Sequence, residues 1–137
     1  MKALVAVLAG SLVLWAQGWT PKRIVGITVY PPEARERRIS GKVAIRCVLS
    51  ADGSVSRTEV ISGHWVFTGQ ALRNALEWQF ERGRSAKDSS TSNEVVLFYE
   101  FVLEVTRNQT PPGVNFIFES PAHVLVTTQI PWPEHSR

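Results

Sequence analysis

The sequence predicts an α+β domain with a small antiparallel sheet and one long helix. Apolar residues alternate along Gly41–Leu49, and the pair Asp52-Gly53 separates this run from a second strand-like run over Ser54–Ser62. An Asp-Gly pair at that place is a strong hairpin signal, because glycine adopts positive φ without strain. The apolar period becomes three and four residues over Thr68–Gln79 and returns to two over Glu94–Val105. This order predicts one sheet with the helix packed across one of its faces.

The first 18 residues have the features of a secretory signal peptide. Lys2 gives a positive start, Ala3–Trp15 is apolar, and Ala16 and Gly18 are the small residues expected near a cleavage site. As a helix the apolar run would reach only about 20 Å, against a hydrocarbon core of about 30 Å. We therefore expect a cleaved signal and an exported protein, with a retained membrane anchor as the alternative.

The net charge does not indicate a nucleic-acid or lipid partner, and the single cysteine does not indicate thiol chemistry. The formal charge is +3 over 137 residues and falls to +2 when Lys2 is removed with the signal. Such a small excess does not point to nucleic acid or to acidic lipid. Cys47 is the single cysteine and shares the apolar face of its strand with Ile45 and Leu49. We expect a buried, unreactive thiol there.

The sequence contains no arrangement typical of an enzyme. His64, His123 and His135 show no metal-ligand spacing and no paired nucleophile. We expect no catalytic residue, no cofactor, no metal and no small-molecule substrate. Trp65 and Trp132 are the tryptophans that could be exposed, and we favour their packing against the chain ends over a binding role.

The order of the elements also predicts the strand order. A right-handed crossover through the helix lays Glu94–Val105 beside the first strand, so that the order is second, first, third. The third strand then lies at an edge with unpaired backbone N–H and C=O groups, which suit strand addition by a partner. The expected partner-binding residues are those along this edge: Val95, Val96, Leu97, Phe98, Tyr99, Glu100, Phe101, Val102 and Leu103.

Two further strand-like runs follow, over Val114–Ser120 and His123–Gln129. They divide the chain into a signal peptide (1–18), a domain (19–107) and a C-terminal β extension (108–137). One of the two runs could pair with Glu94–Val105 and occupy the edge. Alternatively, the runs could form a separate hairpin or exchange with a second copy to make a homodimer.

Several short motifs in a fixed order resemble the TonB C-terminal domain family over roughly 75 residues. They are "YP" before a short helix in "YPPEARERRI", then "GKVAIRCVLSADGSV", "VISGH", a helix ending in "WQF", and a final apolar strand. The order and spacing of these motifs carry the resemblance, since each motif alone is common.

The resemblance implies protein binding in the periplasm rather than chemistry. Proteins with this domain bind outer-membrane transporters during transmembrane transport, and a short TonB-box segment adds as a strand to the last strand of the domain. Energy-transducing members have an inner-membrane anchor and a long proline-rich spacer, whereas here only Trp19–Arg23 lies between the expected signal and the rest of the domain. We therefore expect binding, competition or structural pairing, with an inner-membrane tether only if the N-terminal segment is retained.

Overall fold

The computed structural model describes residues 18–82, 93–107, 113–119 and 122–131. Except for Gly18, the expected signal peptide lies outside these ranges. The elements in chain order are β1 (Trp19–Arg23), α2 (Pro32–Glu36), β2 (Gly41–Leu49), β3 (Val55–Gly63), α3 (Trp65–Leu76), β4 (Gln79–Arg82), β5 (Glu94–Thr106), β6 (Val114–Glu119) and β7 (His123–Pro131).

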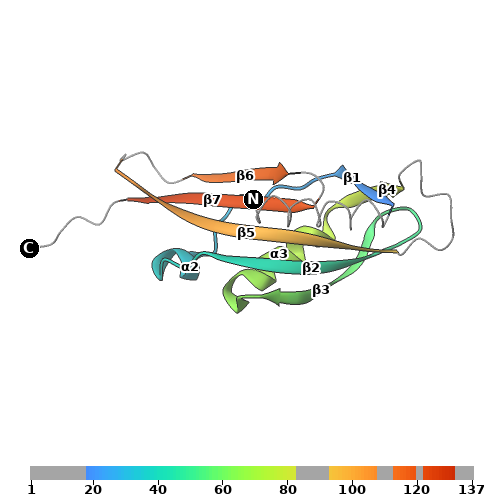
Figure 1. The fold of residues 1–137 in the computed structure, drawn as a ribbon, viewed down its shortest axis with the longest axis horizontal. Helices are drawn as coiled ribbons and strands as arrows, with labels where there is room; N and C mark the ends of the chain where they lie inside the picture. Colours follow the sequence, from blue (N-terminus) through green and yellow to red (C-terminus); the bar gives the residue numbers. More distant parts are fainter. Residues whose placement is uncertain (1–17, 83–92, 108–112, 120–121, 132–137) are drawn as a thin grey trace, which may run out of the picture.

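Five of the strands form one sheet in the order β3-β2-β5-β7-β6 (Figure 1). The order β3-β2-β5 confirms the prediction that the first strand of the hairpin lies between its second strand and Glu94–Val105. The two C-terminal runs extend the same sheet: β6 lies at the far border, and β7 returns between β5 and β6. The sheet is mixed, because β7 runs parallel to β5 whereas the other neighbouring strands are antiparallel.

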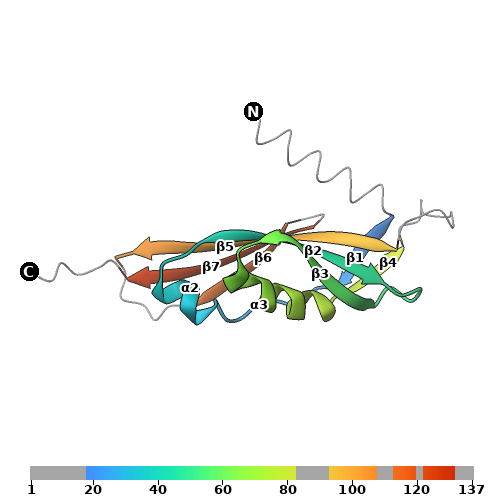
Figure 2. The same ribbon diagram turned by 90° about the horizontal axis from the view of Figure 1, so that it is seen from below.

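One face of the sheet carries the helices, as predicted. Figure 2 shows α2, α3 and the segment 24–30 on the same side of the sheet. Helix α3 contacts β2 and β3. The segment 24–30, called the arm below, reaches the other half of this face, where Gly26 lies beside the Phe116 ring of β6. A chain segment outside the regular elements thus completes the cover that α3 begins.

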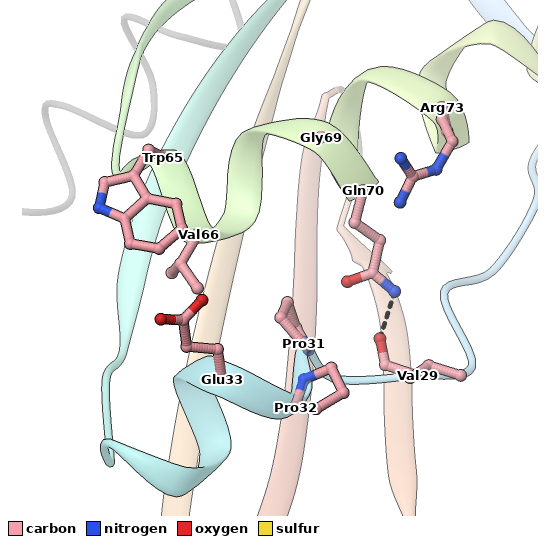
Figure 3. A pocket seen from close by; sticks show the side chains of 9 residues that line it. All are labelled: Val29, Pro31, Pro32, Glu33, Trp65, Val66, Gly69, Gln70 and Arg73. Atoms are coloured by element: carbon pink, nitrogen blue, oxygen red, sulfur yellow. Dashed lines mark hydrogen bonds between the residues drawn. The ribbon is translucent and has the colours of Figure 1, made fainter.

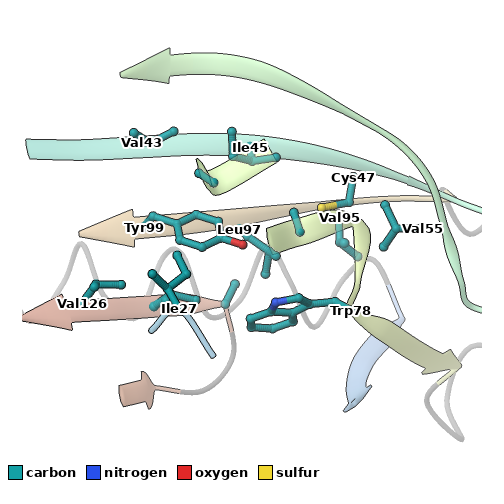
Figure 4. Packing of buried hydrophobic residues seen from close by; sticks show 14 of the residues in the cluster. Ile27, Val43, Ile45, Cys47, Val55, Trp78, Val95, Leu97, Tyr99 and Val126 are labelled. Carbon is teal, nitrogen blue, oxygen red and sulfur yellow. The ribbon is translucent and has the colours of Figure 1, made fainter. Parts of the chain in front are cut away.

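The core lies between this cover and the sheet (Figure 4). Alternate residues of the central strands are fully buried, as the period of two predicts. The fully buried apolar side chains of these strands include Ile45, Cys47, Val95, Leu97, Phe101, Val124 and Val126. Phe101 stacks on Phe67 of α3 with a centroid distance of 4.5 Å. The expectation of a buried Cys47 is confirmed, and burial raises the pKa of its thiol to about 12.

Helix α3 differs from its predicted bounds at both ends. It begins at Trp65 rather than Thr68, because the His64 ring acts as the N-cap and its Nδ1 accepts from the Val66 N–H at 3.1 Å. It ends at Leu76, before the predicted Gln79. Leu76, an apolar residue within the predicted helical stretch, is exposed. The apolar period alone did not locate a cap made by a histidine.

Two strands form a second, smaller sheet that the sequence did not predict. Strand β1 pairs antiparallel with β4, with Trp19 opposite Arg82. The Trp19 side chain is buried, and the Arg82 guanidinium lies 4.9 Å from its ring centroid. The segment after the expected signal is therefore part of the fold. Residues 24–31, between β1 and α2, belong to no assigned helix or strand.

Gly53 holds the β2–β3 turn against β4. Its φ is +88°, and a Cβ at this position would lie 1.8 Å from the Phe80 carbonyl oxygen. The Gly53 carbonyl accepts from the Phe80 N–H at 2.8 Å, so the turn cannot move away without losing this bond. We expect Gly53→Ala to lower the free energy of unfolding by about 1–3 kcal/mol, measured by denaturant unfolding. Gly113→Ala is the control, because nothing lies within 4 Å of a Cβ there; equal effects would contradict the assignment.

Candidate protein-binding site

The predicted binding strand, β5, is divided between two faces of the sheet. Val95, Leu97 and Tyr99 point into the core, whereas Phe98 is 45% exposed on the face without helices. The side chains of this strand therefore have the alternation that the sequence predicted. What decides a strand-addition site, however, is the hydrogen bonding along its edge.

The edge of β5 is not open over most of its length. Strand β7 pairs with it from Phe98↔His123 to Thr106↔Pro131, and the Phe98 N–H donates to the Ala122 carbonyl at 2.9 Å. The expectation that Glu94–Val105 is an edge strand is therefore wrong from Phe98 onward, and the alternative of an edge closed by the tail is confirmed. The reason is that β7 satisfies the backbone groups of β5 and also buries Val124 and Val126.

Residues 95–97 of the predicted set precede the first β7 pair. The partner-binding role assigned to Val95 through Leu103 stays a prediction, and β7 blocks it from Phe98 onward in this arrangement. The borders of the sheet are instead β3 and β6. These two strands are the candidates for strand addition.

The register identifies which groups of β6 face outward. The hydrogen bond from the Phe98 N–H to the Ala122 carbonyl shows that the even-numbered residues of β7 direct their backbone N–H and C=O groups toward β5. The odd-numbered residues of β7 therefore direct these groups toward β6. Residues paired with odd positions, such as Ile117 with Leu125, therefore bond to β7. The outward N–H and C=O groups of β6 belong to Val114, Phe116 and Phe118. Within the described ranges, β6 pairs with β7 alone.

The two borders differ in how they discourage pairing. Strand β3 has two register shifts against β2, and its Glu59 carboxylate lies 3.3 Å from Arg46 and 3.4 Å from Arg57. Irregular register and charged side chains are common protections of sheet edges. Strand β6 pairs with β7 in continuous register and carries a single charge, at Glu119. It is the border with fewer of these protections.

A histidine links three strands on the face without helices. The His123 Nε2 lies 3.2 Å from Glu100 Oε2 on β5, and its Nδ1 lies 3.4 Å from Glu119 Oε2 on β6. The two carboxylates approach opposite ring nitrogens and do not converge on one point. No metal-binding group of three or more His, Cys, Asp or Glu side chains occurs in the described part of the chain. His123 is the first residue of β7, as the predicted run His123–Gln129 implies, and lies next to the edge that β7 closes.

Two carboxamides of α3 hold the arm, and the sequence reasoning missed both. Asn74 is buried; its Nδ2 donates to the Val25 carbonyl at 2.8 Å, and its Oδ1 accepts from Trp78 Nε1 at 3.0 Å and from the Tyr99 hydroxyl at 2.7 Å. Gln70, one turn earlier, donates to the Val29 carbonyl. Burial raises the pKa of Tyr99 well above its usual value, so the hydroxyl stays a donor. The signal in the sequence is the position of Asn74 and Gln70 among the apolar residues of the helix, which indicates that these side chains bond to a neighbouring segment.

The fold and the site together define a small α+β module whose candidate binding feature, within the described ranges, is an open strand edge. Its sequence matches a family model described as "Gram-negative bacterial TonB protein C-terminal" over residues 28–103, and the chain belongs to this family. The matched range ends within β5, so that β6 and β7 lie beyond it.

Among solved structures, the chain is similar to the solution NMR structure of the Pseudomonas aeruginosa TonB C-terminal domain. The identity is 20%, the TM-score is 0.44, and the alignment covers 61% of this chain and 84% of that chain. Comparison with curated proteins gave no match. No helix in the described ranges is long and apolar enough to cross a membrane.

Proposed function

We propose that this chain is an exported, non-catalytic binding module that pairs by strand addition with an extended segment of an outer-membrane transporter in the periplasm. Family membership supports the class of partner. The closed edge of β5 supports a different point of attachment from the one that the sequence suggested. The receiving edge in this proposal is β6.

The observation that carries the proposal is the contrast between the two borders of the sheet. Strand β6 turns the backbone groups of Val114, Phe116 and Phe118 outward in continuous register, whereas β3 is irregular and charged. A guest strand gains a main-chain hydrogen bond at each outward N–H and C=O, largely independent of its side chains. This geometry suits capture of a short segment with few side-chain requirements.

The test compares two substitutions of Phe116. Both Phe116→Pro and Phe116→Ala remove the ring, but only proline removes the outward N–H. The bonds to β7 are kept in both, because they belong to the alternate residues. We expect the affinity for a synthetic peptide spanning the N-terminal box of an outer-membrane transporter to be at least about tenfold lower for the proline variant than for the alanine variant. Fluorescence anisotropy measures the affinity, and circular dichroism checks the fold.

A proline at the other border serves as a control for specificity. Ile61 of β3 is exposed, and we expect Ile61→Pro to leave peptide capture unchanged. Capture that falls with Ile61→Pro and not with Phe116→Pro would assign the guest to β3. Equal capture by the two Phe116 variants would remove strand addition at β6.

A second candidate function is favoured by the pairing of β7 with β5. In this alternative the tail closes the sheet permanently, and the domain has a structural or interaction role without transport. A strand-exchanged homodimer would satisfy the same pairs with β6 and β7 donated by a second copy. Sedimentation distinguishes the two forms: a monomer supports closure within one chain, and a dimer supports exchange.

A further inference from the structure

A groove of about 470 Å³ lies between the two helices, and none of its lining residues belongs to β6 (Figure 3). Val29 at the end of the arm and Pro31 to Glu33 at the start of α2 form one wall. The other wall is the face of α3 from Trp65 to Arg73.

Large apolar side chains flank the groove but are not covered. Trp65 is 63% exposed and Val29 is 54% exposed. The expectation that Trp65 packs against the chain ends is therefore wrong. One ring face is supported by His64, which stacks on it with a centroid distance of 5.7 Å. A rigid, exposed aromatic beside an apolar groove is a common feature of sites that bind extended, proline-containing peptides.

Gly69 contributes no side chain to the wall of the groove. It lies inside α3, where glycine costs about 0.5–1 kcal/mol relative to alanine. The fold does not require glycine there, because an added Cβ would meet only the Arg73 Nη1, at an ordinary distance of 3.6 Å. Packing therefore does not explain why the helix has a glycine here. A glycine is explained if a larger side chain at this position would fill the groove.

Two polar groups of the groove lack partners within the described part of the chain. The Gln70 Oε1 is buried and accepts no hydrogen bond, while its Nε2 is held by the Val29 carbonyl. Arg73 makes no ion pair there, whereas Glu33 on the opposite wall is already paired with Arg37 at 3.4 Å. The groove thus has an unpaired guanidinium, and its charge complement is a carboxylate.

We propose that this groove is a second docking site, which binds an extended, proline-containing segment of a partner protein with an acidic residue placed at Arg73. The apolar residues of the guest lie on Trp65 and Val29. The site is separate from β6, so that one partner with two such segments could engage both surfaces and gain affinity from the link.

The probes are the peptides EPPLPP and PPLPPE, which place the acid at either end, and their lysine analogues. We expect one acidic peptide to shift the Trp65 indole N–H and the Gly69 amide in ¹H–¹⁵N spectra of the purified protein. Its dissociation constant should be about two- to fivefold lower than that of its lysine analogue, as one exposed ion pair allows. Arg73→Glu should reverse this preference, while Lys42→Glu on the opposite face of the sheet should not.

Closing the groove gives a matched pair of variants. Gly69→Leu should weaken binding at least about tenfold, whereas Gly69→Ala should change it less than twofold and keep the helix. Phe116→Pro should have no effect, which separates this site from the β6 proposal. The absence of shifts at the groove, or shifts indifferent to Arg73→Glu and Gly69→Leu, would overturn the proposal. If deleting residues 132–137 alone shifts the groove resonances and only that variant binds peptide, the occupant is the chain's own segment and the partner assignment is wrong.

Discussion

Deleting residues 114–137 is expected to abolish the soluble, cooperatively folded protein. The deletion uncovers the edge of β5 from Phe98 to Thr106 and removes Val124, Val126 and Ile130 from the core. Burial of each of these side chains contributes about 1.5–3 kcal/mol, and their sum is comparable with the whole stability of a small domain. An open apolar edge also favours pairing between copies. We expect sedimentation velocity to show dimers or larger species, and thermal unfolding to lose its cooperativity.

The matched control is deletion of residues 132–137, which keeps all of β7. It should sediment and unfold like the full chain. If the longer deletion also left sedimentation and cooperative unfolding unchanged, β7 would not be an integral strand, and the edge of β5 would be available to a partner as the sequence suggested.

Asn74→Ala is expected to have the largest effect of any single substitution proposed for this chain. It leaves the Val25 carbonyl, Trp78 Nε1 and the Tyr99 hydroxyl without the partner that each has on Asn74. An unsatisfied buried group costs about 1–3 kcal/mol. We expect the free energy of unfolding to fall by about 3–5 kcal/mol, measured by urea titration, because three such groups are stranded at once.

A double-mutant cycle with Tyr99→Phe isolates one part of this network. Tyr99→Phe removes the hydroxyl and should cost about 1 kcal/mol alone, but less when Asn74 is already alanine. Gln70→Ala offers a comparison, since it removes one contact to the arm at a less buried position. Additive effects of Asn74→Ala and Tyr99→Phe would show that the hydrogen bond between them does not stabilise the fold.

The sequence predicted those parts of the fold that depend on local periods. The alternation in Gly41–Leu49 and Glu94–Val105, the Asp-Gly turn and the right-handed crossover were sufficient for the order β3-β2-β5. The position of Cys47 in the core followed from the same alternation. These features are set by residues close in sequence and by handedness, so a single sequence is enough to predict them.

What the sequence did not predict depends on contacts between distant segments. Strands β1 and β4 are short and partly polar, so neither has an apolar period of its own, and only their pairing identifies them as strands. The place of β7 beside β5 was one of three alternatives, because the pattern of an apolar run does not identify its neighbour. The sequence did not predict the groove for a similar reason. Trp65, Gly69 and Arg73 line one site only because α2 and the arm pack against α3.

Amide hydrogen exchange along the sheet shows directly whether β7 closes the edge of β5 and leaves β6 as the open border. The amides of Phe98 and Glu100 should exchange more than about 100-fold more slowly than those of Phe116 and Phe118, since local protection follows hydrogen bonding and burial. Rapid exchange at Phe98 and Glu100 together with protection at Phe116 and Phe118 would show that the edge of β5 is open and that of β6 is covered.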